Sequence, residues 1–195
     1  GVSIVFLIVM LVLPLVYVIY TALREGWKVF VSSVTDEYAV KSIFLTVKVT
    51  VITVIINSVF GIFAAWLITR FKFRGKKLIS TLIDLPLTIS PIIAGLIFVL
   101  TFGRQSAIYP FLEKWGIQII FAVPGIVLAT IFVTFPFISR EIIPVLTVKG
   151  TDEEEAAALM GANGFQIFTQ ITFPHIRWAF LYGVVLCSAR AMGEF

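Results

Sequence analysis

The most conspicuous charged residues in this sequence are four consecutive acids, Asp152, Glu153, Glu154 and Glu155. They follow Thr151, and Thr151-x-x-Glu154 is a capping-box pattern, in which a hydroxyl and a carboxylate each accept a hydrogen bond from a free backbone N–H at a helix start. The positive end of the helix dipole also favours carboxylates at this position. The acids therefore predict the start of a short helix. No catalytic constellation surrounds them, since the single histidine, His175, is expected at a membrane interface.

A second pair of charged residues, Arg190 and Glu194, lies within an apolar stretch. A helix that enters the membrane near Trp178 places Arg190 roughly 18 Å along its axis, past the middle of a hydrocarbon core about 30 Å thick. A charge at that depth must face protein or water. Two interpretations are open. Arg190 forms a structural ion pair with Glu194 four residues on, or its guanidinium adds positive potential to an anion pathway, where an arginine fork suits tetrahedral oxyanions.

The composition places these residues in a membrane protein. Of 195 residues, 59% are hydrophobic and only 13% are charged, against about a quarter charged in ordinary soluble domains. The net charge of +4 comes mostly from loops, so the sequence gives no support to nucleic-acid binding. A single cysteine, Cys187, forms no intrachain disulfide and has no metal-ligand partners at useful spacing, so we expect neither a metal site nor a cofactor.

Five apolar stretches predict five membrane spans, since a helix needs about 20 apolar residues to cross. They lie near residues 2–22, 42–69, 78–102, 118–138 and 176–195. The stretch 70–77, RFKFRGKK, holds five basic residues in eight, so it is expected on the cytoplasmic side, where lipid headgroups are sufficient partners for it. Alternation then places residues 140–175 on the same side. The chain begins and ends inside apolar runs, so we expect a fragment of a longer protein.

The third span is predicted to be broken. Pro86 and Pro91 each remove a backbone donor inside this apolar stretch, and Ser90-Pro91 is typical of an N-cap followed by proline at the first helical position. Broken backbone at membrane depth is tolerated where it is buried or lines a cavity. Asp84 lies beside the break, where a functional role and a local capping role are both open. In the second span, Asn57, Ser58 and Gly61 share a stripe typical of helix contacts.

The segment after the four acids predicts two short helices. Residues 156–160 are strong helix formers, Gly161 is a plausible helix stop, and Asn163-Gly164 is typical of a turn. A second short helix is expected over residues 165–171, and Pro174 can open the next helix.

The spacing of this segment resembles the EAA loop of bacterial ABC-importer permeases. The pattern is Glu155-Ala156-Ala157, three residues, Gly161, nine residues, Ile171, one residue and Phe173-Pro174, with Phe173 where that family usually has leucine. The resemblance implies that residues 140–175, hereafter the coupling loop, dock on a cytoplasmic ATPase subunit. The coupling residues that it implies are Glu154, Glu155, Ala156, Ala157, Gly161, Ala162 and Gly164.

Three further stretches, LIDLPLTISPIIAGL, FPFISREIIPVL and LYGVVLCSARAMGEF, resemble sulfate and thiosulfate permeases of the CysW/CysT type within the MetI-like superfamily. The resemblance implies an all-α polytopic transmembrane bundle, one domain over residues 1–195 with its last helix missing, in the bacterial inner membrane. It implies three kinds of protein partner besides membrane lipid: cytoplasmic ATP-binding subunits, a second permease subunit and an extracytoplasmic anion-binding protein. Pro91, Arg190 and Glu194 are then the candidate pathway residues.

Two alternatives to a sulfate or thiosulfate permease remain at this point. A molybdate or tungstate permease shares the same motifs. An ion-coupled secondary transporter would need no coupling loop and would usually carry more intramembrane acids or inverted repeats. The chain lacks the G-x-x-x-x-G-K-[ST] phosphate loop, so we expect ATP hydrolysis on a separate subunit and no enzyme activity in this chain.

Overall fold

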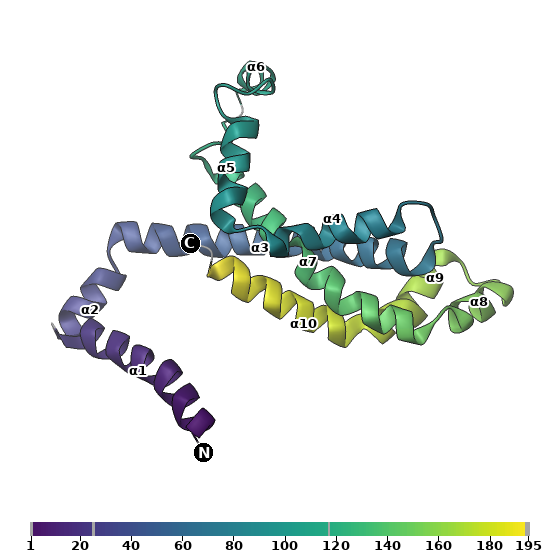
Figure 1. Ribbon diagram of the computed structural model, residues 1–195, viewed down its shortest axis with the longest axis horizontal. Coiled ribbons are helices and arrows are strands. Elements are labelled where there is room, and N and C mark those ends of the chain that lie inside the picture. Colours follow the sequence, from purple (N-terminus) through teal and green to yellow (C-terminus); the bar gives the residue numbers. More distant parts are fainter. Residues whose placement is uncertain (1, 25, 117, 194–195) are drawn as a thin grey trace. The chain divides into compact units, whose positions relative to one another are not determined.

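The computed structural model describes residues 2–24, 26–116 and 118–193, and these residues form helices and turns with no strand among them (Figure 1). The expected all-α class is confirmed. The chain divides into two compact units, Gly1–Leu45 and Thr46–Phe195, and one long helix, α3 (Glu37–Arg70), continues from the first unit into the second.

The first unit contains α1 (Val2–Arg24), α2 (Trp27–Val34) and the first residues of α3. The side chains described along α1 are exposed and almost all apolar, which is typical of a helix surrounded by lipid. Gly26, with φ of +99°, allows the turn into α2. Residues 24–41, between the first two predicted spans, are polar and mixed in charge. The structure forms α2 there and begins α3 at Glu37, five residues before the predicted span.

The second unit contains the remaining helices and the coupling loop. After α3 come α4 (Lys76–Thr88), α5 (Pro91–Phe102), the short α6 (Tyr109–Lys114) and the long α7 (Val123–Lys149). The coupling loop then forms α8 (Asp152–Leu159), α9 (Gly164–Ile167) and a π-helix, η1 (Phe168–Thr172), which leads directly into α10 (Phe173–Met192).

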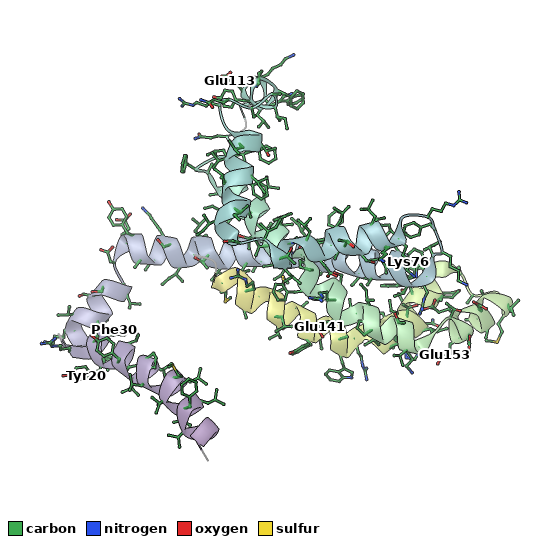
Figure 2. The ribbon with its side chains drawn as sticks, in the orientation of Figure 1. Tyr20, Phe30, Lys76, Glu113, Glu141 and Glu153 are labelled. Carbon is green, nitrogen blue, oxygen red and sulfur yellow. The ribbon has the colours of Figure 1, made fainter. Side chains whose placement is uncertain are left out.

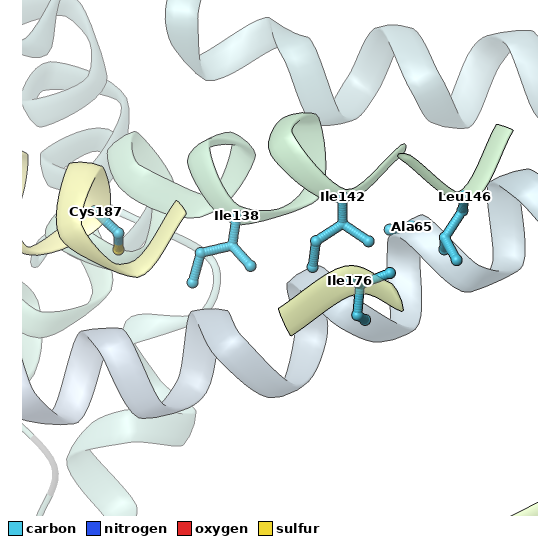
Figure 3. Close-up of a cluster of buried hydrophobic side chains, with 6 residues drawn as sticks. All are labelled: Ala65, Ile138, Ile142, Leu146, Ile176 and Cys187. Atoms are coloured by element: carbon cyan, nitrogen blue, oxygen red, sulfur yellow. The ribbon is translucent and has the colours of Figure 1, made fainter. Parts of the chain in front are cut away.

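The core of the second unit lies between α3, α7 and α10. Three residues on one stripe of α7, Ile138, Ile142 and Leu146, are fully buried there against Ala65 of α3 and Ile176 of α10 (Figure 3). Their spacing of four residues places them on one face of α7. The same three helices expose large apolar side chains on their other faces, as a lipid-facing surface requires.

Two glycines let the core helices approach closely. A Cβ added to Gly61 of α3 would lie 2.9 Å from Cγ2 of Ile138, and one added to Gly183 of α10 would lie 2.9 Å from Cα of the same residue. Nearby, the Asn57 amide nitrogen donates a 2.8 Å hydrogen bond to the Thr134 hydroxyl. The prediction that Asn57 and Gly61 mark a helix contact is therefore confirmed, whereas Ser58 is only half-buried.

Three helices in the described part of the chain are long and apolar enough to cross a membrane: α1 over Val5–Arg24, α3 and α7. The count rises to four if α4 and α5, which are bent by 111° at their junction, form one broken span. The predicted break at Ser90-Pro91 is confirmed, although the Ser90 side chain makes no cap hydrogen bond and Pro86 lies inside α4. The predicted fifth span, α10, is not among them, because His175, Arg177 and Arg190 lower its mean hydropathy.

The fourth predicted span, residues 118–138, is displaced along the chain. Helix α7 begins at Val123, with Pro124 in its first turn, and continues to Lys149. Pro136 and Pro144 therefore both lie inside the helix. A proline is tolerated within a membrane helix when neighbouring helices and local adjustments satisfy the freed backbone groups.

Candidate coupling site

The start of α8 differs from the predicted capping box. Thr151 precedes the helix, but its hydroxyl donates a 2.7 Å hydrogen bond to Oε1 of Glu155 and makes no cap to the backbone. Glu154 does not reach back to Thr151, because its carboxylate is engaged elsewhere. The capping-box prediction at Thr151 is therefore wrong, although the acids do lie in the first turn of the helix.

A capping box forms at the start of α9 instead. The Gln166 backbone N–H donates to Oδ1 of Asn163, and the Asn163 N–H donates to Oε1 of Gln166, both at 2.9 Å. Asn163-Gly164 is thus a helix start and not the predicted turn. Helical structure then runs from Gly164 through η1 into α10, so the predicted separate helix over residues 165–171 is replaced by a continuous one.

Gly161 ends α8 as predicted. Its φ is +90°, a left-handed conformation that glycine adopts without strain. Its N–H bonds to the carbonyl of Ala158 and the Ala162 N–H bonds to the carbonyl of Ala157, both at 3.0 Å. This pair of bonds is a Schellman motif, which satisfies carbonyls that the helix end would otherwise leave open.

An ion pair holds α8 against the end of α3. Nη2 of Arg70 lies 2.7 Å from Oε1 of Glu154, and Nη1 of Arg70 donates a 3.1 Å hydrogen bond to the Leu146 carbonyl near the end of α7. Both side chains are largely buried, with 9% of Arg70 and 15% of Glu154 exposed. The sequence assigned Arg70 to a headgroup-binding stretch. That assignment is wrong for Arg70, because its guanidinium faces protein.

Two more contacts connect α8 to the start of α10. The Thr172 hydroxyl donates a 2.8 Å hydrogen bond to the same Oε1 of Glu154, and Nε2 of His175 lies 2.7 Å from Oε2 of Glu153. The hydrogen bond and the electrostatic interaction with His175 hold the pKa of the Glu153 carboxyl below its usual value. Glu153, on α8, lies at the same end of the second unit as Lys76, at the start of α4 (Figure 2). The contact of His175 with Glu153 on α8 was not predicted from the sequence.

An apolar groove of about 870 Å³ separates α3 from the coupling loop. One wall is formed by Val59, Phe63 and Trp66 of α3, and the other includes Phe165 and Phe168. Arg70, Glu154 and Thr172 also line the groove, so the hydrogen-bonded group described above connects its two walls.

The coupling residues that the resemblance implied divide between two faces. Glu155, Ala156, Gly161 and Gly164 are exposed, Ala157 is buried, and Glu154 and Ala162 are intermediate. Three apolar side chains that the sequence did not single out are also exposed: Leu159 by 90%, Met160 by 83% and Phe165 by 77%. The sequence feature that could have identified them is a pair of large apolar residues at the end of α8 and another at the start of α9, where an amphipathic pattern does not continue. Such exposed apolar side chains are typical of a surface that binds a partner.

Residues 57–195 match the family described as binding-protein-dependent transport system inner membrane component. This chain belongs to that family. The matched region begins within α3 and includes the core and the whole coupling site. The resemblance to the permeases of ABC importers is thereby confirmed, with the MetI-like fold class that it implied.

Several curated permeases are similar to this chain. It is 46% identical over 185 residues to the sulfate transport system permease protein CysW of Escherichia coli (strain K12), covering 95% of this chain and 64% of that protein. It is 47% identical over 195 residues to CysW of Synechococcus elongatus, covering all of this chain and 68% of that protein. It is 38% identical over 184 residues to the probable sulfate transport system permease protein cysT of Prototheca wickerhamii, covering 94% and 72%. The chain thus spans about two thirds of the length of these relatives.

The candidate pathway residues of this chain are only partly described. Pro91 begins α5, which packs on α7 with the Phe98 and Phe132 rings 5.9 Å apart. Arg190 lies half-buried in the last turn of α10, and Glu194 lies outside the described residues. The pathway therefore stays a prediction.

Asp84, the acid beside the break, pairs with a residue of the facing helix. Its Oδ1 lies 3.3 Å from Nε of Arg140 on α7, and about half of each side chain is exposed. The local capping role is thus replaced by a contact between α4 and α7. An exposed pair of this kind contributes little to stability, about 0–1 kcal/mol.

Proposed function

We propose that this chain belongs to the permease subunit of an ATP-driven ABC importer that carries sulfate or thiosulfate across the bacterial cytoplasmic membrane. The observation that carries the proposal is the identity of 46–47% with CysW proteins over nearly the whole chain. The exposed apolar side chains of the coupling loop support it, because a permease of this kind needs a surface for its ATPase.

The proposed partners follow from the two faces of the coupling loop. Cytoplasmic ATP-binding subunits bind the exposed face, where Leu159, Met160 and Phe165 lie on either side of the turn at Gly161. Glu155, exposed in the first turn of α8, offers a carboxylate to a cation on that subunit. ATP hydrolysis takes place on the partner. A second permease subunit and an extracytoplasmic anion-binding protein complete the importer.

The proposed anion pathway uses the broken span and the charged end of α10. The 111° bend between α4 and α5 leaves irregular backbone at a position where a membrane protein tolerates it only against protein or a cavity. We assign Pro91, Arg190 and Glu194 to this pathway, with Arg190 as the anion contact because its guanidinium stays charged at any physiological pH.

The test is transport by the complete importer in proteoliposomes. The full-length permease, its partner permease, the ATPase and the anion-binding protein are reconstituted, and uptake of labelled sulfate, thiosulfate and molybdate is measured with and without ATP. We expect ATP-dependent uptake of sulfate that thiosulfate inhibits. Uptake of molybdate alone would support the molybdate permease instead, and uptake driven by an ion gradient without ATP would support a secondary transporter.

A further inference from the structure

Arg70, the last residue of α3, connects this helix to α8 and to the end of α7. Its guanidinium binds Glu154 of α8 at 2.7 Å and the Leu146 carbonyl of α7 at 3.1 Å, so one side chain connects three helices. The planar fork of arginine suits this geometry, because two nitrogens can donate in different directions at once.

The carboxylate of Glu154 extends this connection to α10. Its Oε1 accepts hydrogen bonds from both Arg70 and the Thr172 hydroxyl, which lies at the end of η1 and is 2% exposed. A single oxygen therefore joins α3, α8 and the π-helix before α10. π-Helical turns occur often at functional sites, and here the turn lies directly between α9 and α10.

The Arg70–Glu154–Thr172 group lies beside the apolar groove between α3 and the coupling loop. The groove leaves open space between side chains of α3 and those of α9 and η1. The Arg70–Glu154–Thr172 group crosses between them. A displacement of α8 therefore reaches α3 directly through this polar group.

We infer that Arg70 is a positioning residue that passes movement of α8 to α3 and α7, with Glu154 and Thr172 as its partners. The inference rests on the proposed function, in which a bound ATPase moves α8. A buried ion pair suits this task, since its geometry is specific even where its net contribution to stability is small.

The experiment compares variants of the complete importer in proteoliposomes, normalised to assembled complex. The variants are Arg70→Met, Glu154→Gln, Thr172→Val and the double variant Arg70→Met/Glu154→Gln. The double variant removes the link without leaving an unpaired buried charge, so it guards against a failure to fold. The controls, Arg74→Met and Lys77→Met, change exposed charges in the basic stretch that begins at Arg70 and lies outside the coupling loop.

Two quantities are measured. The first is sulfate taken up per ATP hydrolysed, which we expect to fall about tenfold in Arg70→Met and in the double variant and to stay unchanged in the controls. The second is hydrogen exchange over residues 152–159, which we expect to become at least about tenfold faster in Arg70→Met, since removing one partner of a buried pair strongly weakens its site. Thr172→Val should produce a smaller change of the same kind.

The outcomes separate this inference from the proposed function. Parallel losses of uptake and hydrolysis, with their ratio unchanged in every variant, would mean that the group only stabilises the fold and would overturn the inference. Exchange at α8 that is unaffected by Arg70→Met would overturn it as well. If the unmodified importer moves no sulfate, the proposed substrate is wrong. Hydrogen exchange, which needs no anion, still decides whether Arg70 holds α8.

Discussion

Gly161 ends α8 in a backbone conformation that disfavours any residue with a side chain. Its φ is +90°, and a Cβ built there would meet nothing within 4 Å, so the cost of a substitution comes from the backbone alone. We expect Gly161→Ala to cost about 1–2 kcal/mol, which is about 5–30-fold in the local opening equilibrium. Faster hydrogen exchange at the last turn of α8 would measure this cost, and weaker ATPase binding should accompany it.

The matched control is Gly164→Ala, three residues further along the same loop. Gly164 also has open space around a Cβ, but its φ is not positive. We expect this change to leave hydrogen exchange at α8 nearly unaltered. Equal effects of the two alanines would contradict a special role for the left-handed conformation at Gly161.

At the scale of the helices, α3 and α10 both pack against Ile138 of α7 through a glycine. A Cβ at Gly61 would meet the Ile138 side chain, whereas one at Gly183 would meet its Cα, and both contacts would be at 2.9 Å. We expect Gly183→Ala to destabilise the protein by about 1–3 kcal/mol, because backbone cannot move aside as a side chain can. Gly61→Ala should cost less. Thermal unfolding of the detergent-solubilised permease measures both changes.

Two further variants make the packing prediction specific. Gly95→Ala, within α5 and with open space around its Cβ, should stabilise its helix by up to about 1 kcal/mol. Ile138→Ala removes Cγ2 but keeps Cβ, which would lie 3.0 Å from a Cβ at Gly61, so it should relieve Gly61→Ala in part. It leaves the 2.9 Å contact of Gly183→Ala with Cα in place, so a double-mutant cycle should report stronger coupling at Gly61 than at Gly183. Equal coupling at both glycines would contradict the predicted geometry.

At the scale of the whole molecule, the proposed importer must move a doubly charged anion through a helical domain whose core is apolar. Arg190, half-buried in the last turn of α10, is the residue that we assign to this task. We expect Arg190→Gln to leave the assembled, ATPase-bound complex intact and to slow sulfate uptake sharply, because the positive potential is lost. Glu194→Gln should do less harm. Uptake of labelled sulfate, normalised to assembled complex, distinguishes the two variants.

The alternative for Arg190 is a purely structural ion pair with Glu194. In that case Arg190→Gln should lower the amount of folded protein, since losing one partner of a buried pair costs about 3–5 kcal/mol. The double variant Arg190→Gln/Glu194→Gln should then recover full uptake. Such recovery would rule out Arg190 as an anion contact.

Local signals in the sequence predicted the features that depend on a few neighbouring residues. The break before α5 followed from Ser90-Pro91, since proline lacks a backbone donor and restricts the preceding residue. The end of α8 followed from Gly161, since the left-handed conformation there favours glycine. The family itself followed from the spacing of residues in the coupling loop, because this spacing can be read directly along the sequence.

Local signals gave wrong predictions where a residue binds a different partner from the one that its sequence neighbours suggest. Thr151 and Glu154 have the spacing of a capping box, but Glu154 binds Arg70 and Thr172 instead. An ion pair with a buried guanidinium is a stronger hydrogen bond than a neutral cap. Asn163-Gly164 has the composition of a turn, yet Gln166 three residues on completes a cap there and begins α9.

The sequence by itself determined the membrane class, the helical content, the break at Ser90-Pro91 and the family, because hydropathy, proline and glycine act over a few residues. Only the tertiary structure decided that Arg70 and Glu154, 84 residues apart, form one buried pair, and that Gly61 and Gly183 face the same isoleucine. These contacts depend on how α3, α7 and α10 pack together. A basic residue at the end of a membrane helix suits a lipid headgroup as well as a carboxylate, and the packed helices select the carboxylate.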